Sequence, residues 1–130
     1  MATLETGVQY YTKEHEWIEF SDGIVTVGIT DHAQESLGDM VYVGDLPKMG
    51  AKVASGDVIA VVESVKATSD VYTPIDGVIE EVNSDLEEAP ETLNQDPHGD
   101  GWLVRIRVRE VPEPDDFMDE EAYATFCQEG

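Results

Sequence analysis

The sequence is poor in basic residues, in cysteine and in long apolar runs. Only 7 Lys and Arg stand against 29 Asp and Glu in 130 residues, a formal net charge of −22. A surface of this sign repels nucleic acid and anionic membranes, which excludes both as partners. The single cysteine, Cys127, excludes an intramolecular disulfide and a thiol cluster for zinc. No apolar run is long enough to cross a bilayer, and the N-terminus lacks signal-peptide or transit character, so we expect a cytoplasmic location in a prokaryote.

The rest of the composition is that of one globular domain. A hydrophobic content of 41% in 130 residues is enough for a core, so we expect residues 1–130 to form a single domain and a monomer. The acidic residues are spread along the chain and are not gathered in a tail. We interpret this distribution as adaptation to a halophilic prokaryote, in which dense carboxylates keep proteins soluble at high salt.

Short β-prone runs alternate with glycine-containing turns along the chain. The runs expected to form strands are 17–20, 24–30, 39–46, 58–62, 68–72, 78–83 and 102–108. In the second of these, Val25, Val27 and Ile29 fall on one face, which indicates a strand buried on one side. The runs do not alternate with long helical segments. The pattern therefore predicts a mostly-β sandwich or barrel with short peripheral helices.

Helices are expected in three places. Residues 31–34 have the spacing of a capping box that begins at Asp31, and Gly38 ends the short helix that follows. Residues 84–101 are acidic and loop-like, with one helical turn at 90–94. A C-terminal helix is predicted at about 115–129, where either Met118, Ala122 and Cys127 or Tyr123 and Phe126 have helical spacing and form an apolar stripe that docks on the sheet.

The most informative stretch is Glu63-Ser64-Val65-Lys66-Ala67, between the β-prone runs 58–62 and 68–72. It predicts a hairpin with its only lysine, Lys66, near the tip. The simplest reading is a lysine that keeps a turn soluble, as most surface lysines do. However, the turn lacks the Asn-Gly or Gly-Gly of a purely structural hairpin. A lone amine on a rigid turn favours an attachment point.

These residues, followed by Thr-Ser-Asp and then by a Pro and a Gly, resemble the lipoyl-lysine hairpin of the glycine cleavage system H proteins. Four further motifs occur in the order of that family, so the resemblance covers nearly the whole chain. They are Lys13-Glu-His-Glu-Trp17, Val27-Gly-Ile-Thr-Asp-His-Ala-Gln34, Leu37-Gly-Asp39 and Gly101-Trp102. The departures are the general acidity and Asp100 before Gly101, and neither affects the lysine.

The resemblance implies a flattened β-sandwich, or barrel-sandwich hybrid, of the lipoyl and biotinyl carrier type. It implies lipoate bound covalently to Lys66, with Glu63, Ser64, Val65 and Ala67 as the surrounding recognition residues and no catalytic residue. Such a carrier is not an enzyme. Its arm takes an aminomethyl group from glycine decarboxylase (P protein) to the aminomethyltransferase (T protein). Dihydrolipoamide dehydrogenase (L protein) then reoxidises the arm, and a lipoate-attaching enzyme is a further partner.

Carboxylates suit the protonated amine of the cargo, and the candidates for a cleft that shields it are Glu14, Glu16 and Asp70. The alternative is that these three carboxylates are ordinary solvent-exposed groups, as most of the 29 acidic residues must be. His15 and His32 lie near acids, but no Cys/His pair has the spacing of metal ligands, so no metal site is expected.

Other readings of the lysine remain. Lipoyl domains of 2-oxoacid dehydrogenases usually present Asp-Lys-Ala, and biotinyl domains flank the lysine with methionine, unlike Val65 and Ala67 here. The chain could also be an H-like protein that relays lipoate to other acceptors, or an unmodified interaction module. An enzyme with Lys66 as nucleophile would need a lowered lysine pKa, which Glu63 and Asp70 would oppose.

Overall fold

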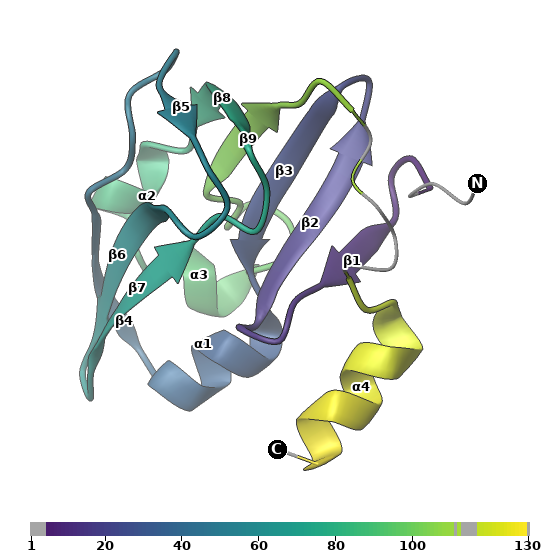
Figure 1. Ribbon diagram of the computed structural model, residues 1–130. Helices are drawn as coiled ribbons and strands as arrows, with labels where there is room; N and C mark the ends of the chain where they lie inside the picture. Colours follow the sequence, from purple (N-terminus) through teal and green to yellow (C-terminus); the bar gives the residue numbers. More distant parts are fainter. Residues whose placement is uncertain (1–4, 111, 113–116, 130) are drawn as a thin grey trace.

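A computed structural model of the chain describes residues 5–110, 112 and 117–129 (Figure 1). Within these residues the strands are β1 (Gln9–Tyr11), β2 (Glu16–Ser21), β3 (Ile24–Ile29), β4 (Met40–Gly44), β5 (Lys52–Val53), β6 (Val58–Ser64), β7 (Thr68–Tyr72), β8 (Gly77–Val82) and β9 (Val104–Arg107). The helices are α1 (Asp31–Leu37), α2 (Asp85–Glu88), α3 (Thr92–Gln95) and α4 (Glu120–Glu129). Among these segments no helix combines the length and apolarity that a bilayer crossing requires.

The strands form two antiparallel sheets. The larger sheet has the order β1-β2-β3-β9-β8-β5, and the smaller has the order β4-β6-β7. In Figure 1 the smaller sheet lies at the left of the larger one, and the turn between β6 and β7 lies at its lower end. The expected mostly-β sandwich with short helices and a C-terminal helix is confirmed.

One buried apolar cluster takes residues from both sheets. Its members include Ile18, Val25 and Val27 of the larger sheet and Ile59 and Val62 of the smaller one, all at most 1% exposed. The alternation in β3 predicted this inner face correctly. Burial of two complementary apolar faces is the main stabilising term of such a sandwich.

A second, smaller cluster joins α4 to β1. The Tyr11 and Tyr123 rings stack with centroids 4.6 Å apart, and Trp17 completes the buried set. Tyr11 and Met118 exchange two backbone hydrogen bonds of 2.8 Å, so the segment before α4 pairs with the edge strand β1. The expectation that the C-terminal helix docks on the sheet is confirmed, but the helix begins at Glu120. Residues 115 and 116 of the expected helix lie outside the described residues.

The remaining boundaries differ in detail from the sequence-based expectations. β1 was not expected, nor was β5, which lies in a segment expected to be a connection. The N-cap of α1 is Thr30, whose hydroxyl accepts from the Ala33 amide at 3.2 Å, so the assignment of the cap to Asp31 was wrong. The acidic segment 84–101 contains two one-turn helices, α2 and α3, where one turn was expected.

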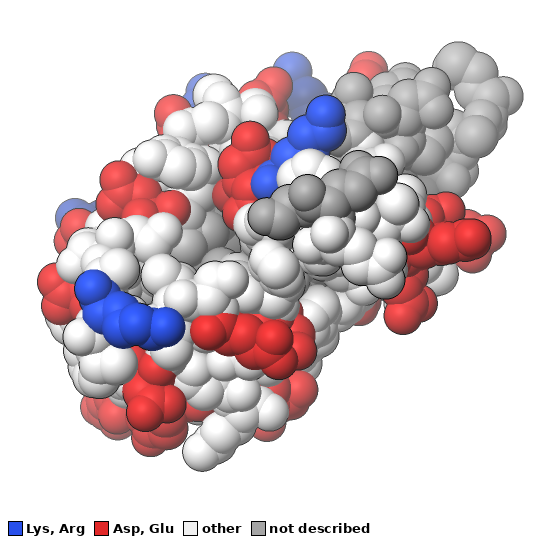
Figure 2. All heavy atoms as spheres, turned by 90° about the horizontal axis from the view of Figure 1, so that it is seen from below, with Lys and Arg blue, Asp and Glu red and all other residues white. Residues whose placement is uncertain are grey.

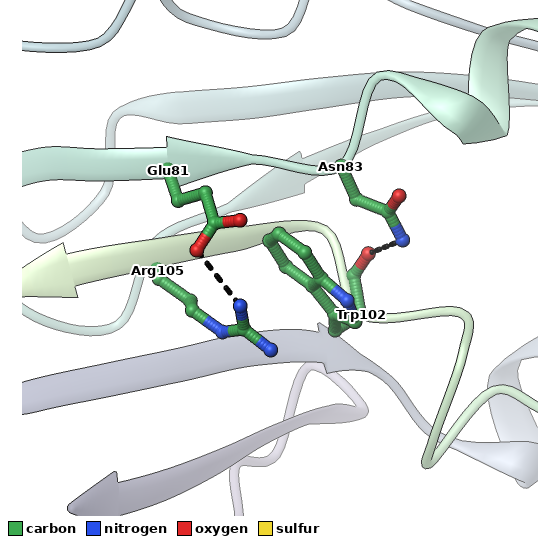
Figure 3. A network of polar contacts seen from close by, with 4 residues as sticks. All are labelled: Glu81, Asn83, Trp102 and Arg105. Carbon is green, nitrogen blue, oxygen red and sulfur yellow. Dashed lines mark hydrogen bonds and ion pairs between the residues drawn. The ribbon is translucent and has the colours of Figure 1, made fainter.

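A network of polar contacts, which includes one of the few basic residues, stabilises the pairing of β8 with β9. Arg105 lies 4.0 Å from the Trp102 ring centroid and forms a 2.8 Å ion pair with Glu81 (Figure 3). Asn83 donates to the backbone carbonyls of Trp102 and Asp100 at 2.8 and 2.9 Å. Few other basic groups meet the carboxylates: Figure 2 shows acidic side chains scattered over one face with few basic ones between them.

Candidate functional site

The turn between β6 and β7 is closed by the side chain of Ser64. Its hydroxyl accepts from the backbone amides of Lys66 and Ala67, at 3.2 and 3.1 Å, and donates to the Ala67 carbonyl. A backbone bond of 2.8 Å also joins Ser64 to Ala67. The Val65 amide donates to the Asp39 carbonyl at 3.0 Å, which ties the turn to the segment between α1 and β4. The backbone around Lys66 is therefore fixed although its side chains are exposed.

The Lys66 side chain extends from this turn over Gly38, at the C-terminal end of α1. A Cβ atom added to Gly38 would lie 3.1 Å from the Lys66 Cε, and Gly38 has a φ of 86°. The positive φ favours glycine there, and the absence of a side chain leaves room for the lysine to lie over it. Among the described residues Lys66 makes no ion pair and no side-chain hydrogen bond. The result is a solvent-accessible primary amine on a rigid support.

Two of the candidate carboxylates lie in a cleft at the other end of β7. Its volume is about 660 Å³, and its walls are the β1–β2 turn, the segment before β6, the end of β7, and Phe117 and Met118. Glu14 and Glu16 line this cleft, as do Tyr72 and Thr73. Asp70 and Lys66 do not. The structure therefore brings Glu14 and Glu16 together and leaves Asp70 on the strand outside.

Glu16 is unusual among the acids because it is buried, with 4% of its surface exposed. Its carboxylate accepts from the Tyr72 amide and from the Thr12 hydroxyl, each at 3.2 Å. Burial raises the pKa of Glu16 to about 7, and Glu14 acts in the same direction, whereas the two hydrogen bonds oppose the rise. Near neutral pH this carboxyl group is poised to lose its proton when a cation enters the cleft.

The outer face of β7 connects the lysine turn to the cleft. Thr68, Asp70 and Tyr72 are exposed, and they alternate with the half-buried Ser69 and the buried Val71. Tyr72 is also part of the cleft wall. Since a strand rises about 3.3 Å per residue, Thr68 to Tyr72 spans about 13 Å. Asp70 thus lies on an exposed path between Lys66 and the carboxylates of the cleft.

Sequence reasoning missed several residues of this site. Tyr72 could have been found, because it lies two residues after Asp70 and so shares its face of the strand. Gly38 was identified only as a helix end, and its contact with Lys66 depends on how α1 packs beside the small sheet. Glu63 is half-buried in β6 and pairs with Thr68, whereas Val65 is 67% exposed.

Comparisons with known proteins agree on one family. The family model described as Glycine cleavage H-protein matches residues 9–130. The glycine cleavage system H protein of Thermotoga maritima is 53% identical over 117 residues, covering 90% of this chain and 94% of that protein. That of Pseudoalteromonas atlantica is 52% identical over 130 residues, covering 99% of each.

A solved structure leads to the same conclusion. The crystal structure of a glycine cleavage system H protein from Mycobacterium marinum superposes with a TM-score of 0.81 at 39% identity, covering 93% of this chain and 97% of the other. Sequence and fold therefore agree over almost the full length of both chains. The chain belongs to the glycine cleavage H-protein family.

Proposed function

We propose that this chain is the lipoyl carrier of a glycine cleavage system and that Lys66 is its attachment residue. The observation that supports this most directly is the accessible Lys66 amine on a turn fixed by Ser64 and by the Asp39 carbonyl. An attaching enzyme needs such a target, because a preformed turn is recognised without the entropic cost of ordering it. Glu63, Val65 and Ala67 present the flanking surface to that enzyme.

Lipoate fits this position on chemical grounds. Joined to Lys66 by an amide, it supplies a strained cyclic disulfide that opens readily, as carriage of a one-carbon unit and of electrons requires. Its reach is on the order of 10–15 Å by bond-length arithmetic. The path along β7 from Thr68 to Tyr72 has a similar length, about 13 Å. No side chain larger than glycine at position 38 obstructs the lysine stem.

The chain's own carboxylates supply the binding chemistry for a protonated amine. Glu14 and Glu16 line one cleft, and an ammonium group there favours the ionised form of Glu16. Asp70 offers a third carboxylate, which is exposed, on the way to the cleft. Glu14, Glu16 and Asp70 are thus positioning residues, and the partner enzymes perform the catalysis.

The partners that follow from this role are glycine decarboxylase, the aminomethyltransferase, dihydrolipoamide dehydrogenase and a lipoate-attaching enzyme. We further infer that the chain works as a single lipoyl-carrier domain, as a monomer, in the cytoplasm of a halophilic prokaryote. The net charge of −22 supports the last point, because it favours solubility at high salt.

The attachment residue is tested by intact mass measurement and peptide mapping after incubation with lipoate and a lipoate ligase. We expect one lipoyl increment, located on the peptide that contains Lys66. Lys66→Arg should abolish the increment, and Lys52→Arg, which changes an exposed lysine on β5, should leave it intact. An increment that persists in Lys66→Arg would assign attachment to another residue, and a wild-type chain that refuses lipoate would refute the carrier role.

The role of the carboxylates is tested separately, by the hydrolysis rate of the methylamine-loaded protein. We expect Asp70→Asn to shorten its half-life several-fold, because one carboxylate partner of the amine is lost. Asp22→Asn, in the exposed β2–β3 turn, is the matched control. Equal half-lives for wild type and Asp70→Asn would show that Asp70 does not protect the cargo.

A further inference from the structure

Three side chains from separate parts of the chain meet beside α4 and outside the lysine site. They are His15 from the β1–β2 turn, His32 from the first turn of α1, and Cys127 from α4. One ligand atom from each lies within 4.8 Å of the other two, and the two imidazole rings stack with centroids 4.5 Å apart. All three side chains are half-buried. None of them lines the cleft of Glu14 and Glu16.

Two imidazole nitrogens and a thiol sulfur are the donors that zinc prefers. With Zn–N bonds of about 2.0 Å and Zn–S bonds of about 2.3 Å, ligand atoms in a tetrahedral site lie about 3.3–3.6 Å apart. The three atoms here would therefore approach one another by roughly 1 Å, which side-chain rotation supplies. A water molecule would complete the fourth position of such a site. Harder cations such as Mg²⁺ and Ca²⁺ prefer oxygen ligands and do not suit this donor set.

Hydrogen bonds hold the His15 ring in place. Its Nδ1 lies 2.7 Å from the Tyr123 hydroxyl, which lies 2.7 Å from the Thr30 hydroxyl. With Nδ1–H donating to Tyr123, the other ring nitrogen, Nε2, is left with a free lone pair. Metal-binding histidines commonly use their second nitrogen in this way.

The backbone of His15 supports the same role. His15 has a φ of 66°, which is costly for a residue with a side chain, and bonds to Thr12 and Thr30 maintain it.

We propose that His15, His32 and Cys127 form a zinc site that fastens α4 to α1 and to the β1–β2 turn. Binding forms one Zn–S and two Zn–N bonds and displaces one proton, that of the Cys127 thiol, to the solvent; no oxidant or reductant is needed. Bound zinc would link Cys127 to His15 and His32, which precede it by 112 and 95 positions in the sequence. Long-range attraction by the net charge of −22 raises the local concentration of divalent cations.

Cobalt is the probe of choice, because its thiolate complexes are coloured and the surface carboxylates of this chain give no such signal. We expect one equivalent of Co²⁺ to produce a thiolate-to-cobalt charge-transfer band and the visible bands of four-coordinate cobalt, and one equivalent of Zn²⁺ to abolish both. Molar KCl and excess Mg²⁺ occupy the carboxylates during the titration. The Lys66→Arg background removes any lipoyl dithiol that could supply sulfur ligands.

Cys127→Ser should remove the charge-transfer band, and His32→Gln should weaken Zn²⁺ binding at least tenfold in competition with a chromophoric chelator. Both variants are compared with wild type by circular dichroism in EDTA, and Glu35→Gln on α1 serves as a control that keeps all three ligands. Cobalt that binds without a charge-transfer band, or Zn²⁺ affinity that is unchanged in Cys127→Ser, would overturn the proposal. If either variant fails to fold, hydrogen exchange of α4 in the wild type decides, since zinc must slow it.

Discussion

The burial of Glu16 makes a quantitative prediction about how stability depends on pH. Folding raises the pKa of this carboxyl from its ordinary 4.5 to about 7. The folded state therefore binds the proton more tightly than the unfolded state. The contribution of Glu16 to stability is fully present below pH 4.5 and is lost as the pH rises to about 7. At about 1.4 kcal/mol per pH unit, the loss is about 3 kcal/mol.

Glu16→Gln isolates this contribution, because glutamine has nearly the same shape and carries no charge at any pH. Its amide oxygen can accept from the Tyr72 amide, and its NH₂ group can donate to the Thr12 hydroxyl, so both hydrogen-bond positions remain filled. We expect the unfolding free energy of the variant to exceed that of wild type by up to about 3 kcal/mol at pH 8. At pH 4.5 the two unfolding free energies should agree within about 0.5 kcal/mol.

The assay is urea unfolding at several values between pH 4.5 and 8 in constant molar KCl, with the difference between variant and wild type plotted against pH. Other carboxylates titrate in both proteins and cancel in this difference. Glu35→Gln removes one exposed charge and measures the general benefit of reducing the net charge of −22. If Glu16→Gln and Glu35→Gln change the unfolding free energy by the same amount at every pH, the argument from the burial of Glu16 is refuted.

Three further predictions follow from the packing and the charge. Gly28→Ala should lower the unfolding free energy, measured in urea, by about 2–3 kcal/mol, because the added Cβ would lie 2.6 Å from the Trp17 indole ring. A loss under 1 kcal/mol would contradict this prediction. Asn94→Ala should lower the unfolding free energy by about 2–4 kcal/mol, because the Asn94 side chain accepts from the Met40 amide and donates to the Gln34 side chain and the Gly38 carbonyl. An unchanged urea midpoint would show that water replaces these bonds. The melting temperature should rise steeply between dilute buffer and molar KCl, because salt screens the repulsion within a chain of net charge −22. A melting temperature that does not change with KCl concentration would exclude halophilic adaptation.

The parts of the fold that sequence analysis predicted are those with local signals. The alternation of Val25, Val27 and Ile29 identified the inner face of β3, and Gly38 identified the end of α1. β1 was missed because its residues, Gln9–Tyr11, show no clean alternation. That strand exists because it pairs with β2 on one side and with Met118 on the other, and the second of these contacts joins opposite ends of the chain.

The same division between local and distant signals applies to the site. The lysine turn is local, since Ser64 closes it through residues at most three positions away. The burial of Glu16 is not local, because it depends on contact with Tyr72, 56 residues further along the chain. The expectation that no metal site exists was based on the spacing of Cys and His residues in the sequence. Sequence spacing cannot show that the packing of α4 brings His15, His32 and Cys127 together.

Strand β7 explains how one small domain combines an exposed amine with a buried carboxylate. At its first end the strand follows the turn of Lys66, where Val65 is 67% exposed. At its last end the Tyr72 amide donates to Glu16, which is 4% exposed. In the proposed carrier, exposure of the turn gives partner enzymes access to Lys66, and the cleft of Glu14 and Glu16 takes the cargo. About 13 Å of strand separates the two environments, and the proposed lipoyl arm, on the order of 10–15 Å long, has the length to span that distance.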